Sequence, residues 1–413
     1  MRESEYDWII VGAGAAGISI AEMLSRLGLK ILLLERNPQL AAETSRIFHE
    51  WLHTGSLYTL VPDRLKTTRY LLGAIDDLFE YYSGYARMNM AGTESGLIVK
   101  SNGWFNDEHI HYRYRARPLN PVWGLAVARA RWLINGIDHH DWLRRRAGSI
   151  HDGFRFNLIE TIRNYPNRRS GFVTVKSPDV TMNSRVLLTD LLNVYEQAGN
   201  SIVVNCDVTK ITDCCDHVEV ESNFGKFSAR HAVICCADGI ARFTHANVKI
   251  SYAPMFAVSG IGDETESFAE LDYYTKSSIN LLNKGNGYGL AGGISVGRED
   301  QIQPYYKYCV DLHKKRNPNI RVLDMYVGLK KELVGRGQER NYLYHITDVS
   351  ENVWGVVLGK FTLMFSLAPE FIRRVYRSNP PRAQSLKPDH GTLQHPMLSN
   401  PCWQDIVDNS EAR

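Results

Sequence analysis

The chain has 413 residues, of which 44% are hydrophobic and 23% are charged, and its formal net charge is +3. This length suits two interleaved domains with substantial cores, and so small a net charge gives no reason to expect a nucleic-acid partner. Apolar runs stay well short of the roughly 20 residues that span a bilayer. We therefore expect no transmembrane segment, although the sequence leaves peripheral membrane contact open.

Cysteine usage and the first residues bear on where the protein works. The seven cysteines include the neighbouring pairs Cys214-Cys215 and Cys235-Cys236, but no C-x-x-C motif and no metal-ligand spacing. The first predicted strand follows directly on residues 1–5, without the pattern of a signal peptide. We therefore expect a reduced, cytoplasmic protein without a metal site.

The first 35 residues hold the most informative pattern of the chain. A short apolar run at 6–11 meets the motif Gly12-Ala13-Gly14-Ala15-Ala16-Gly17, which is followed by an amphipathic segment at 18–27 and a second apolar run that ends in Glu35. This order of strand, glycine motif, helix, strand and acid is the dinucleotide-binding fingerprint in its proper context. A glycine-rich turn in an unrelated fold is much the weaker interpretation.

The residue types of this motif each have a physical reason. Gly12 permits the tight turn, Gly14 lets a pyrophosphate approach the backbone, and Gly17 lets the helix pack on the strand. The helix N-terminus offers N–H groups and a positive dipole end to the phosphates. Glu35 is placed to accept hydrogen bonds from the adenosine ribose hydroxyls and would repel a 2′-phosphate. The sequence therefore favours FAD or NAD over NADP.

Further elements are predicted in chain order. Helices are predicted at 64–82, 120–134 and 185–198, and a last one ends at about residue 376. Strands are predicted at 109–117, 201–205, 208–212, 217–221, 226–228, 232–236 and 352–358. Strand-like runs between residue 250 and about 345 predict an antiparallel sheet, which is a different kind of layer from the opening unit.

Two polar regions have plain structural interpretations. The strand at 109–117 carries Arg113, Arg115 and Arg117 on one face. Such a face is more typical of a solvent-exposed edge than of a ligand-binding wall, and it could equally meet an acidic partner or lipid headgroups. A further basic cluster stands at 144–146. The proline-rich, polar tail after residue 378 is expected to lie on the surface or to be partly disordered.

A set of sequence blocks in this order resembles the D-amino-acid-oxidase-like superfamily of FAD-dependent oxidoreductases. Within it the chain is most similar to the branch of glycerol-3-phosphate dehydrogenase and L-2-hydroxyglutarate oxidase. The blocks are Gly12–Gly17 with Glu35, residues 44–46 followed by 53–58, residues 183–185, residues 232–239 and residues 353–362. The resemblance implies an α/β fold in which a Rossmann-like FAD-binding domain is interleaved with an antiparallel-sheet (α+β) substrate domain.

The resemblance also suggests domain boundaries. The FAD-binding domain would comprise residues 1–85, 171–245 and 346–377. A substrate or cap insertion would span 86–170, the antiparallel substrate domain 246–345, and the tail 378–413.

Cofactor-binding positions follow from the motif and from the resemblance. We assign FAD binding to Gly12, Gly14, Ala15, Ala16, Gly17, Glu35, Arg36, Thr44, Ser45, Val208, Ala237, Gly359, Lys360, Phe361 and Thr362. The last four stand at a strand-to-helix junction, where helix N-terminal amides would face the N1–C2=O edge of the flavin. An ordinary strand-to-helix turn is the alternative for that segment.

Catalytic and substrate-binding candidates rest mainly on the resemblance. It places His53 beside flavin and substrate, where an imidazole can take a hydroxyl proton. A structural histidine at a turn is an equally good interpretation, and His345 is a weaker candidate. Lys360 would add charge at the flavin. Lys330 stands where the resembling enzymes use arginine against an anion, and Arg336 and Arg340 follow it. A solvated basic loop is the alternative for these three.

Together these features predict an FAD-dependent oxidoreductase that removes hydride from a CH–OH or CH–NH carbon. The substrate is expected to be small and polar, and an anionic one is favoured. One alternative is an amine or amino-acid oxidase, because an amine that is already deprotonated needs no dedicated base. Another is a flavin-binding scaffold or sensor without turnover. The sequence leaves the electron acceptor open between oxygen and another molecule.

Overall fold

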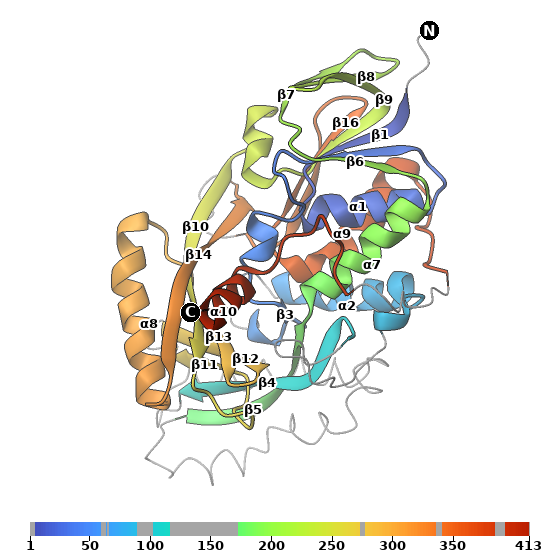
Figure 1. The fold of residues 1–413 in the computed structure, drawn as a ribbon. Helices are drawn as coiled ribbons and strands as arrows, with labels where there is room; N and C mark the ends of the chain where they lie inside the picture. The colour runs from blue at the N-terminus through green and yellow to red at the C-terminus, as the bar shows by residue number, and fades with distance from the viewer. Residues whose placement is uncertain are drawn as a thin grey trace.

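The computed structural model describes residues 5–58, 63, 66–88, 102–115, 172–272, 277–335, 341–384 and 393–412. Within this part of the chain the strands form two sheets of eight strands each. Figure 1 shows the first sheet in the upper part of the view and the second in the lower part. The expected fold, a parallel Rossmann-like sheet joined to an antiparallel-rich sheet, is confirmed.

Five of the described helices frame these sheets, and a sixth lies in the tail. They are α1 (Ala15–Ser25), α2 (Lys66–Tyr82), α7 (Ser184–Gln197), α8 (Ile302–Arg316), α9 (Met364–Tyr376) and α10 (Cys402–Glu411). None of them has the length and hydropathy needed to cross a membrane.

The first sheet is built around β1 (Tyr6–Val11), and both neighbours of β1 run parallel to it. Ile10 lies opposite Leu33 of β2 (Ile31–Leu34) and opposite Val233 of β9 (Gly225–Ile234). Helices α1, α7 and α9 cover one face of β1, while β7 and β8 contribute to the core on the other. Burial on both faces explains why β1 is an unbroken apolar run.

The order of this sheet is β15-β16-β9-β1-β2-β6, and β8 joins β9 to β7. The other strands of this sheet are β6 (Ser201–Val203), β7 (Val208–Asp213), β8 (Val218–Ser222), β15 (Tyr344–Asp348) and β16 (Val353–Leu358). The predicted strands at 226–228 and 232–236 are one continuous strand, β9. The loop after β16 therefore returns to the same sheet as the glycine motif, more than 300 residues earlier in the chain.

The second sheet has the order β14-β10-β13-β12-β11-β4-β5-β3, and its neighbours are antiparallel except for the parallel pair β11 and β4. Its strands are β3 (Trp51–Leu52), β4 (Phe105–Arg115), β5 (Phe172–Met182), β10 (Val248–Ser259), β11 (Phe268–Asp272), β12 (Ser277–Gly285), β13 (Tyr288–Gly293) and β14 (Arg321–Leu333). Because β5 belongs to this sheet, part of the range 171–245 lies in the second layer. The domain boundaries themselves stay a prediction.

The antiparallel sheet predicted for 250–345 is confirmed but incomplete, and one interpretation of the second layer is wrong. The stretch 250–345 also contains α8, which buries only Cys309 and His313, so its polar residues show little helical periodicity. The basic strand β4 is an inner strand between β11 and β5 rather than a solvent-exposed edge. Its Arg113 guanidinium lies 3.9 Å from the ring centre of Phe268. The helix predicted at 120–134 and the cluster at 144–146 lie outside the described residues.

The described part of the tail contains a packed helix that its composition does not predict. Helix α10 begins directly after Pro401, which serves as its N-cap residue. Trp403 and Val407 of this helix are buried in the core of the second sheet. The Trp403 indole N–H also donates to Glu50 Oε2 at 2.8 Å, and Glu50 pairs with Lys284 of β12 at 2.6 Å. Two buried apolar residues and one buried polar network thus hold α10 against the second sheet, although the tail is rich in proline.

Candidate active site

A cavity of about 530 Å³ lies between the two sheets. Thirteen of the predicted cofactor-binding residues line it: Gly12, Gly14, Ala15, Ala16, Glu35, Arg36, Thr44, Ser45, Val208, Ala237, Gly359, Lys360 and Phe361. Both His53 and Lys330 line the same cavity. The fold therefore collects residues from distant parts of the chain around one space. Gly17 and Thr362 do not line the cavity, but they contact residues that do.

The glycine motif has the geometry that its sequence predicts. Gly12 adopts φ +103°, which L side chains rarely tolerate. A Cβ on Gly17 would stand 1.9 Å from the carbonyl oxygen of Gly12, so only glycine lets α1 start so close to β1. A Cβ on Gly14 would meet the Ser45 hydroxyl at 3.2 Å. Gly12 and Gly17 thus shape the turn, while Gly14 keeps the cavity wall thin.

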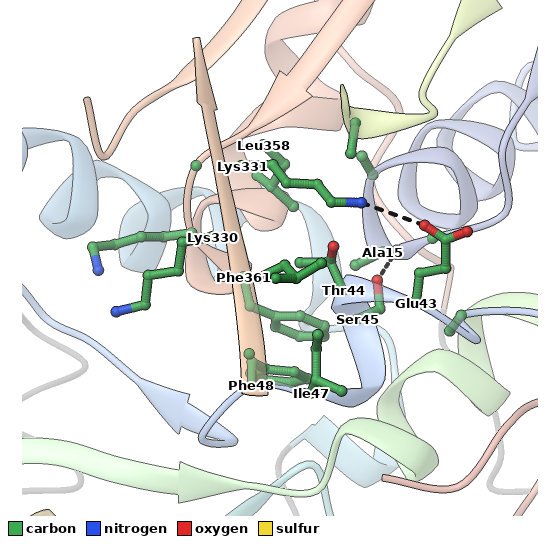
Figure 2. Close-up of a pocket in the computed structure, with 18 of the residues that line it drawn as sticks. Ala15, Glu43, Thr44, Ser45, Ile47, Phe48, Lys330, Lys331, Leu358 and Phe361 are labelled. Carbon is green, nitrogen blue, oxygen red and sulfur yellow. Dashed lines mark hydrogen bonds and ion pairs between the residues drawn. The ribbon is translucent and has the colours of Figure 1, made fainter. Parts of the chain in front are cut away.

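The first turn of α1 faces a hydroxyl group. The backbone N–H of Ala15 donates to Ser45 Oγ at 2.9 Å, as Figure 2 shows. Ser45 lies in a 3₁₀ turn, η1 (Thr44–Arg46), that reaches across the helix N-terminus. Backbone amides, a helix dipole and hydroxyls at one place are the groups that bind phosphate oxygens.

Glu35 is fixed at the end of β2. Its Oε2 accepts from the backbone N–H of Ala13 at 2.9 Å, and its Oε1 accepts from the backbone N–H and side-chain amide of Asn37 at 2.9 and 2.7 Å. Glu35 is 7% exposed and lines the cavity. It is therefore held beside the glycine motif by three donors before any ligand arrives.

The junction after β16 closes the other end of the cavity. A 3₁₀ turn, η6 (Phe361–Leu363), precedes α9, which confirms the predicted strand-to-helix junction. A Cβ on Gly359 would stand 2.5 Å from the carbonyl oxygen of Leu343. The ring of Phe361 stacks on Phe48 at 4.1 Å between centres (Figure 2). Thr362 Oγ1 accepts from the backbone N–H of His53 at 3.1 Å, so the junction holds the histidine loop in place.

His53 follows β3 and is oriented by Asp179 of β5. The Nδ1 atom of His53 lies 3.4 Å from Asp179 Oδ2, and the His53 side chain is 15% exposed. Burial lowers the pKa of His53 to about 4, even though Asp179 opposes the shift, and the charge of Lys360 lowers it further. The imidazole is therefore neutral near pH 7.

Asp179 is the main site residue that sequence reasoning missed. It is fully buried and accepts from the backbone N–H and hydroxyl of Thr54 at 2.8 and 2.6 Å, from Trp51 Nε1 at 2.8 Å, and from the Tyr112 hydroxyl. Burial alone would raise the pKa of Asp179, but hydrogen bonds from His53, Thr54 and Tyr112 hold it below its usual value. A fixed, ionised carboxylate thus stands behind His53.

Lysine side chains supply positive charge to the cavity. The Lys360 ammonium lies 4.3 Å from the ring centre of Tyr58 and 4.7 Å from that of Tyr342. Lys330 lies on β14, and its charge and that of Lys360 both lower the pKa of His53.

Lys331 leaves β14 on the opposite side from Lys330 (Figure 2). Its ammonium pairs with Asp238 at 2.6 Å and with Glu43 at 3.4 Å.

Of the other three candidates, one lies away from the cavity and two fall outside the described residues. His345 is not among the residues that line the cavity, and its Nε2 lies 2.6 Å from the amide nitrogen of Asn341. Arg336 and Arg340 lie outside the described residues. Of the predicted substrate-binding residues, Lys330 is therefore the one that the structure places at the cavity.

Comparison with known proteins decides the family. Residues 7–262 match the family described as FAD dependent oxidoreductase (DAO). The chain belongs to this family. No curated protein matches its sequence.

Solved structures share the fold of this DAO-family chain at low sequence identity. Glycine oxidase from Geobacillus kaustophilus has a TM-score of 0.64 at 12% identity, over 94% of this chain and 98% of that one. L-α-glycerophosphate oxidase from Mycoplasma pneumoniae, with FAD bound, has a TM-score of 0.61 at 16% identity, over 96% and 98%. NikD, an amino acid oxidase of nikkomycin biosynthesis, has a TM-score of 0.61 at 14% identity, over 94% and 100%.

The cofactor of this family is FAD, and the cavity of this chain suits it. At one end, Glu35 offers carboxylate oxygens where a ribose would lie, and the Gly14 wall with Ser45 suits a pyrophosphate. Gly359 and Phe361 line the same cavity as His53, and the neighbouring Thr362 hydroxyl accepts from the His53 backbone N–H. Which of these residues touch FAD stays a prediction.

Proposed function

We propose that this FAD-dependent oxidoreductase removes hydride from the CH–OH carbon of a small, polar, anionic substrate. The observation that carries the proposal is the His53 imidazole, held by the buried carboxylate of Asp179 in a cavity that Lys330 and Lys360 also line. The proposal places the chain near the branch of glycerol-3-phosphate dehydrogenase and L-2-hydroxyglutarate oxidase. The seven cysteines are all free, which supports a reducing, cytoplasmic setting.

His53 is the proton acceptor in this proposal. An alcohol must lose its hydroxyl proton as hydride leaves the neighbouring carbon, and a neutral imidazole can accept that proton. Because Nδ1 of His53 faces Asp179, we assign the acceptor role to Nε2. The carboxylate of Asp179 then stabilises the imidazolium that forms and keeps the ring in one orientation. Bound FAD supplies the hydride acceptor.

Lys330 and Lys360 support an anionic substrate. Each ammonium lies close enough to the two histidines of the cavity to lower the pKa of His49 and of His53. Burial of a carboxylate or phosphate is costly unless a cation accompanies it, and Lys330 and Lys360 both line the cavity. Arg336 and Arg340 stay predicted contributors.

Amine or amino-acid oxidation is the second candidate, because glycine oxidase and NikD share this fold. A deprotonated amine needs no proton acceptor, so this reaction would make little use of the pair formed by His53 and Asp179. A flavoprotein without turnover would make no use of the pair at all.

The test is anaerobic mixing of the holoenzyme with hydroxy acids, sugar phosphates and amino acids, followed by the loss of flavin absorbance. We expect a hydroxy acid or sugar phosphate to bleach the flavin. Bleaching by amino acids alone would move the assignment to the CH–NH alternative. A flavin that no member of the panel reduces would contradict the proposed function.

A further inference from the structure

One row of residues crosses the face of the second sheet that the cavity reaches. Met255 lies opposite Gly292, Gly292 opposite Asn280, Asn280 opposite Ala269, and Ala269 opposite Tyr112. Directly opposite residues share one face of a sheet, so these five residues form one row, in which Gly292 contributes no side chain. Asn280 stands between a glycine and an alanine, and it lines the cavity together with Met255 and Ala269. The small neighbours leave space above its amide.

Two buried polar atoms near this row lack a partner among the described residues. They are Asn280 Oδ1 and Nε2 of His49. A Cβ on Gly292 would stand 2.8 Å from His49 Nε2 and 3.5 Å from Asn280 Oδ1. Both atoms therefore flank Gly292, and the absence of a side chain there lets His49 approach the sheet. Asn280 is 6% exposed, and both residues line the cavity.

Buried polar atoms without a hydrogen-bond partner, at the wall of a cavity, indicate a ligand-binding position. Buried polar groups in folded proteins are nearly always hydrogen-bonded, and an unpaired one costs free energy. An amide oxygen accepts hydrogen bonds only, so its partner must carry an N–H or O–H. Burial, followed by the charge of Lys330, lowers the pKa of His49 well below its usual value, so its ring is neutral and offers one donor and one acceptor.

We propose that His49 and Asn280 form a recognition site for a hydroxyl or amino group of the substrate, separate from the group that is oxidised. The inference rests on the proposed function, because it places this site in the same substrate cavity as His53. The substrate then carries three features: an anionic group, an oxidisable carbon, and a further hydrogen-bond donor on a nearby carbon. Asn280 accepts from that donor, and His49 pairs with the same group.

Matched ligands test the site directly. Three pairs differ by one hydroxyl and keep the anionic group: glycerate and lactate, glycerol 3-phosphate and propane-1,2-diol 1-phosphate, and serine and alanine. Each is titrated anaerobically into the holoenzyme, and the perturbation of the flavin spectrum gives its dissociation constant. We expect the hydroxyl-bearing member of at least one pair to bind about tenfold tighter or better, as one well-made hydrogen bond allows.

Three variants show whether the preference comes from this site. Asn280→Leu, which keeps the side-chain volume but removes the acceptor, should bring the ratio of the two dissociation constants close to one. Gly292→Ala should do the same, because its methyl group displaces His49. Ser278→Ala, on the same strand and in the same cavity, is the control and should keep the preference. FAD content and melting temperature verify that each variant is folded.

The outcomes separate this inference from the proposed function. Flavin reduction without a preference for the hydroxyl-bearing ligands, or a preference that survives Asn280→Leu, overturns the site and leaves the proposed function standing. A preference in binding without any reduction supports the site and contradicts the proposed function. A melting temperature that falls by many degrees in Asn280→Leu shows that the amide serves the fold, and this also overturns the site.

Discussion

At the scale of single residues, the pair of His53 and Asp179 is the chemical centre of the account. Asp179 is held by Thr54, Trp51 and Tyr112, and it fixes the Nδ1 edge of the imidazole. Burial keeps that imidazole neutral over the physiological pH range. A histidine in this state is ready to accept a proton, and it does not compete for the anionic group that the lysines attract.

The pH dependence of flavin reduction follows from this state. With a pKa of about 4 for His53, the rate should stay constant from about pH 8 down to about pH 5 and fall at lower pH, because protonation removes the acceptor. Stopped-flow reduction across this range measures it. An inflection near 6.5, the ordinary value for histidine, would show an imidazole that is not desolvated.

At the scale of elements, the turn between β1 and α1 depends on a contact that glycine alone allows. Gly17→Ala should abolish FAD binding and destabilise the protein, since its Cβ would stand 1.9 Å from the Gly12 carbonyl oxygen. Gly73→Ala in α2 is the matched control, because no atom lies within 4 Å of its Cβ. That change should stabilise the protein by about 0.5–1 kcal/mol through helix propensity. FAD content and thermal unfolding report both, and a Gly17→Ala protein with normal FAD content would contradict this reading of the motif.

The C-terminal helix supports the histidine loop from outside the sheet. Trp403→Phe keeps an aromatic ring in the core but removes the N–H that donates to Glu50, three residues before His53. Because Glu50 is buried, the loss should lower the free energy of unfolding by about 1–3 kcal/mol. Chemical denaturation measures it. An unchanged stability would mean that α10 contributes nothing to the loop.

Elements with a strong local pattern could be predicted from the sequence. The unit β1-α1-β2, helix α7 and the junction after β16 lie where the apolar runs and glycines indicate. Helix α8 could not be predicted, because its buried side is only two residues wide. The position of β4 inside the sheet could not either, since strand partners depend on contacts far apart in the chain.

The candidate site was predictable in the same uneven way. The glycine motif and Glu35 act through neighbours in sequence, so their spacing reveals them. Asp179 stands 126 residues from His53, and Asn280 still farther, in strands without a motif. The register of the sheet brings these residues together, and that register could not be predicted from the sequence.

At the scale of the whole molecule, Lys331 joins the two sheets across the cavity. It projects from β14 of the second sheet to Asp238 and Glu43 near the glycine motif, and its side chain is 6% exposed. Glu43 also accepts from Arg36 Nε at 3.0 Å. This network lies along the cavity wall at the end near Glu35, so it fixes how closely the two layers approach there.

Lys331→Met should therefore loosen this closure. We expect FAD to dissociate faster and the free energy of unfolding to fall by about 1–2 kcal/mol, less than for a fully buried pair because both acids are more than a third exposed. Lys330→Met, on the same strand but the other side, is the control and should leave FAD retention unchanged. FAD release followed by fluorescence distinguishes the two, and equal retention in both variants would rule out the role of Lys331.

The most direct test of the central claim compares flavin reduction in the wild type and in His53→Gln with the same hydroxy acid or sugar phosphate under anaerobic conditions. Glutamine keeps much of the volume of histidine, but its amide accepts no proton near pH 7. The account predicts that the variant retains FAD and binds the substrate, while its limiting reduction rate falls by about 10²–10⁴-fold. A variant that reduces its flavin as fast as the wild type would contradict it.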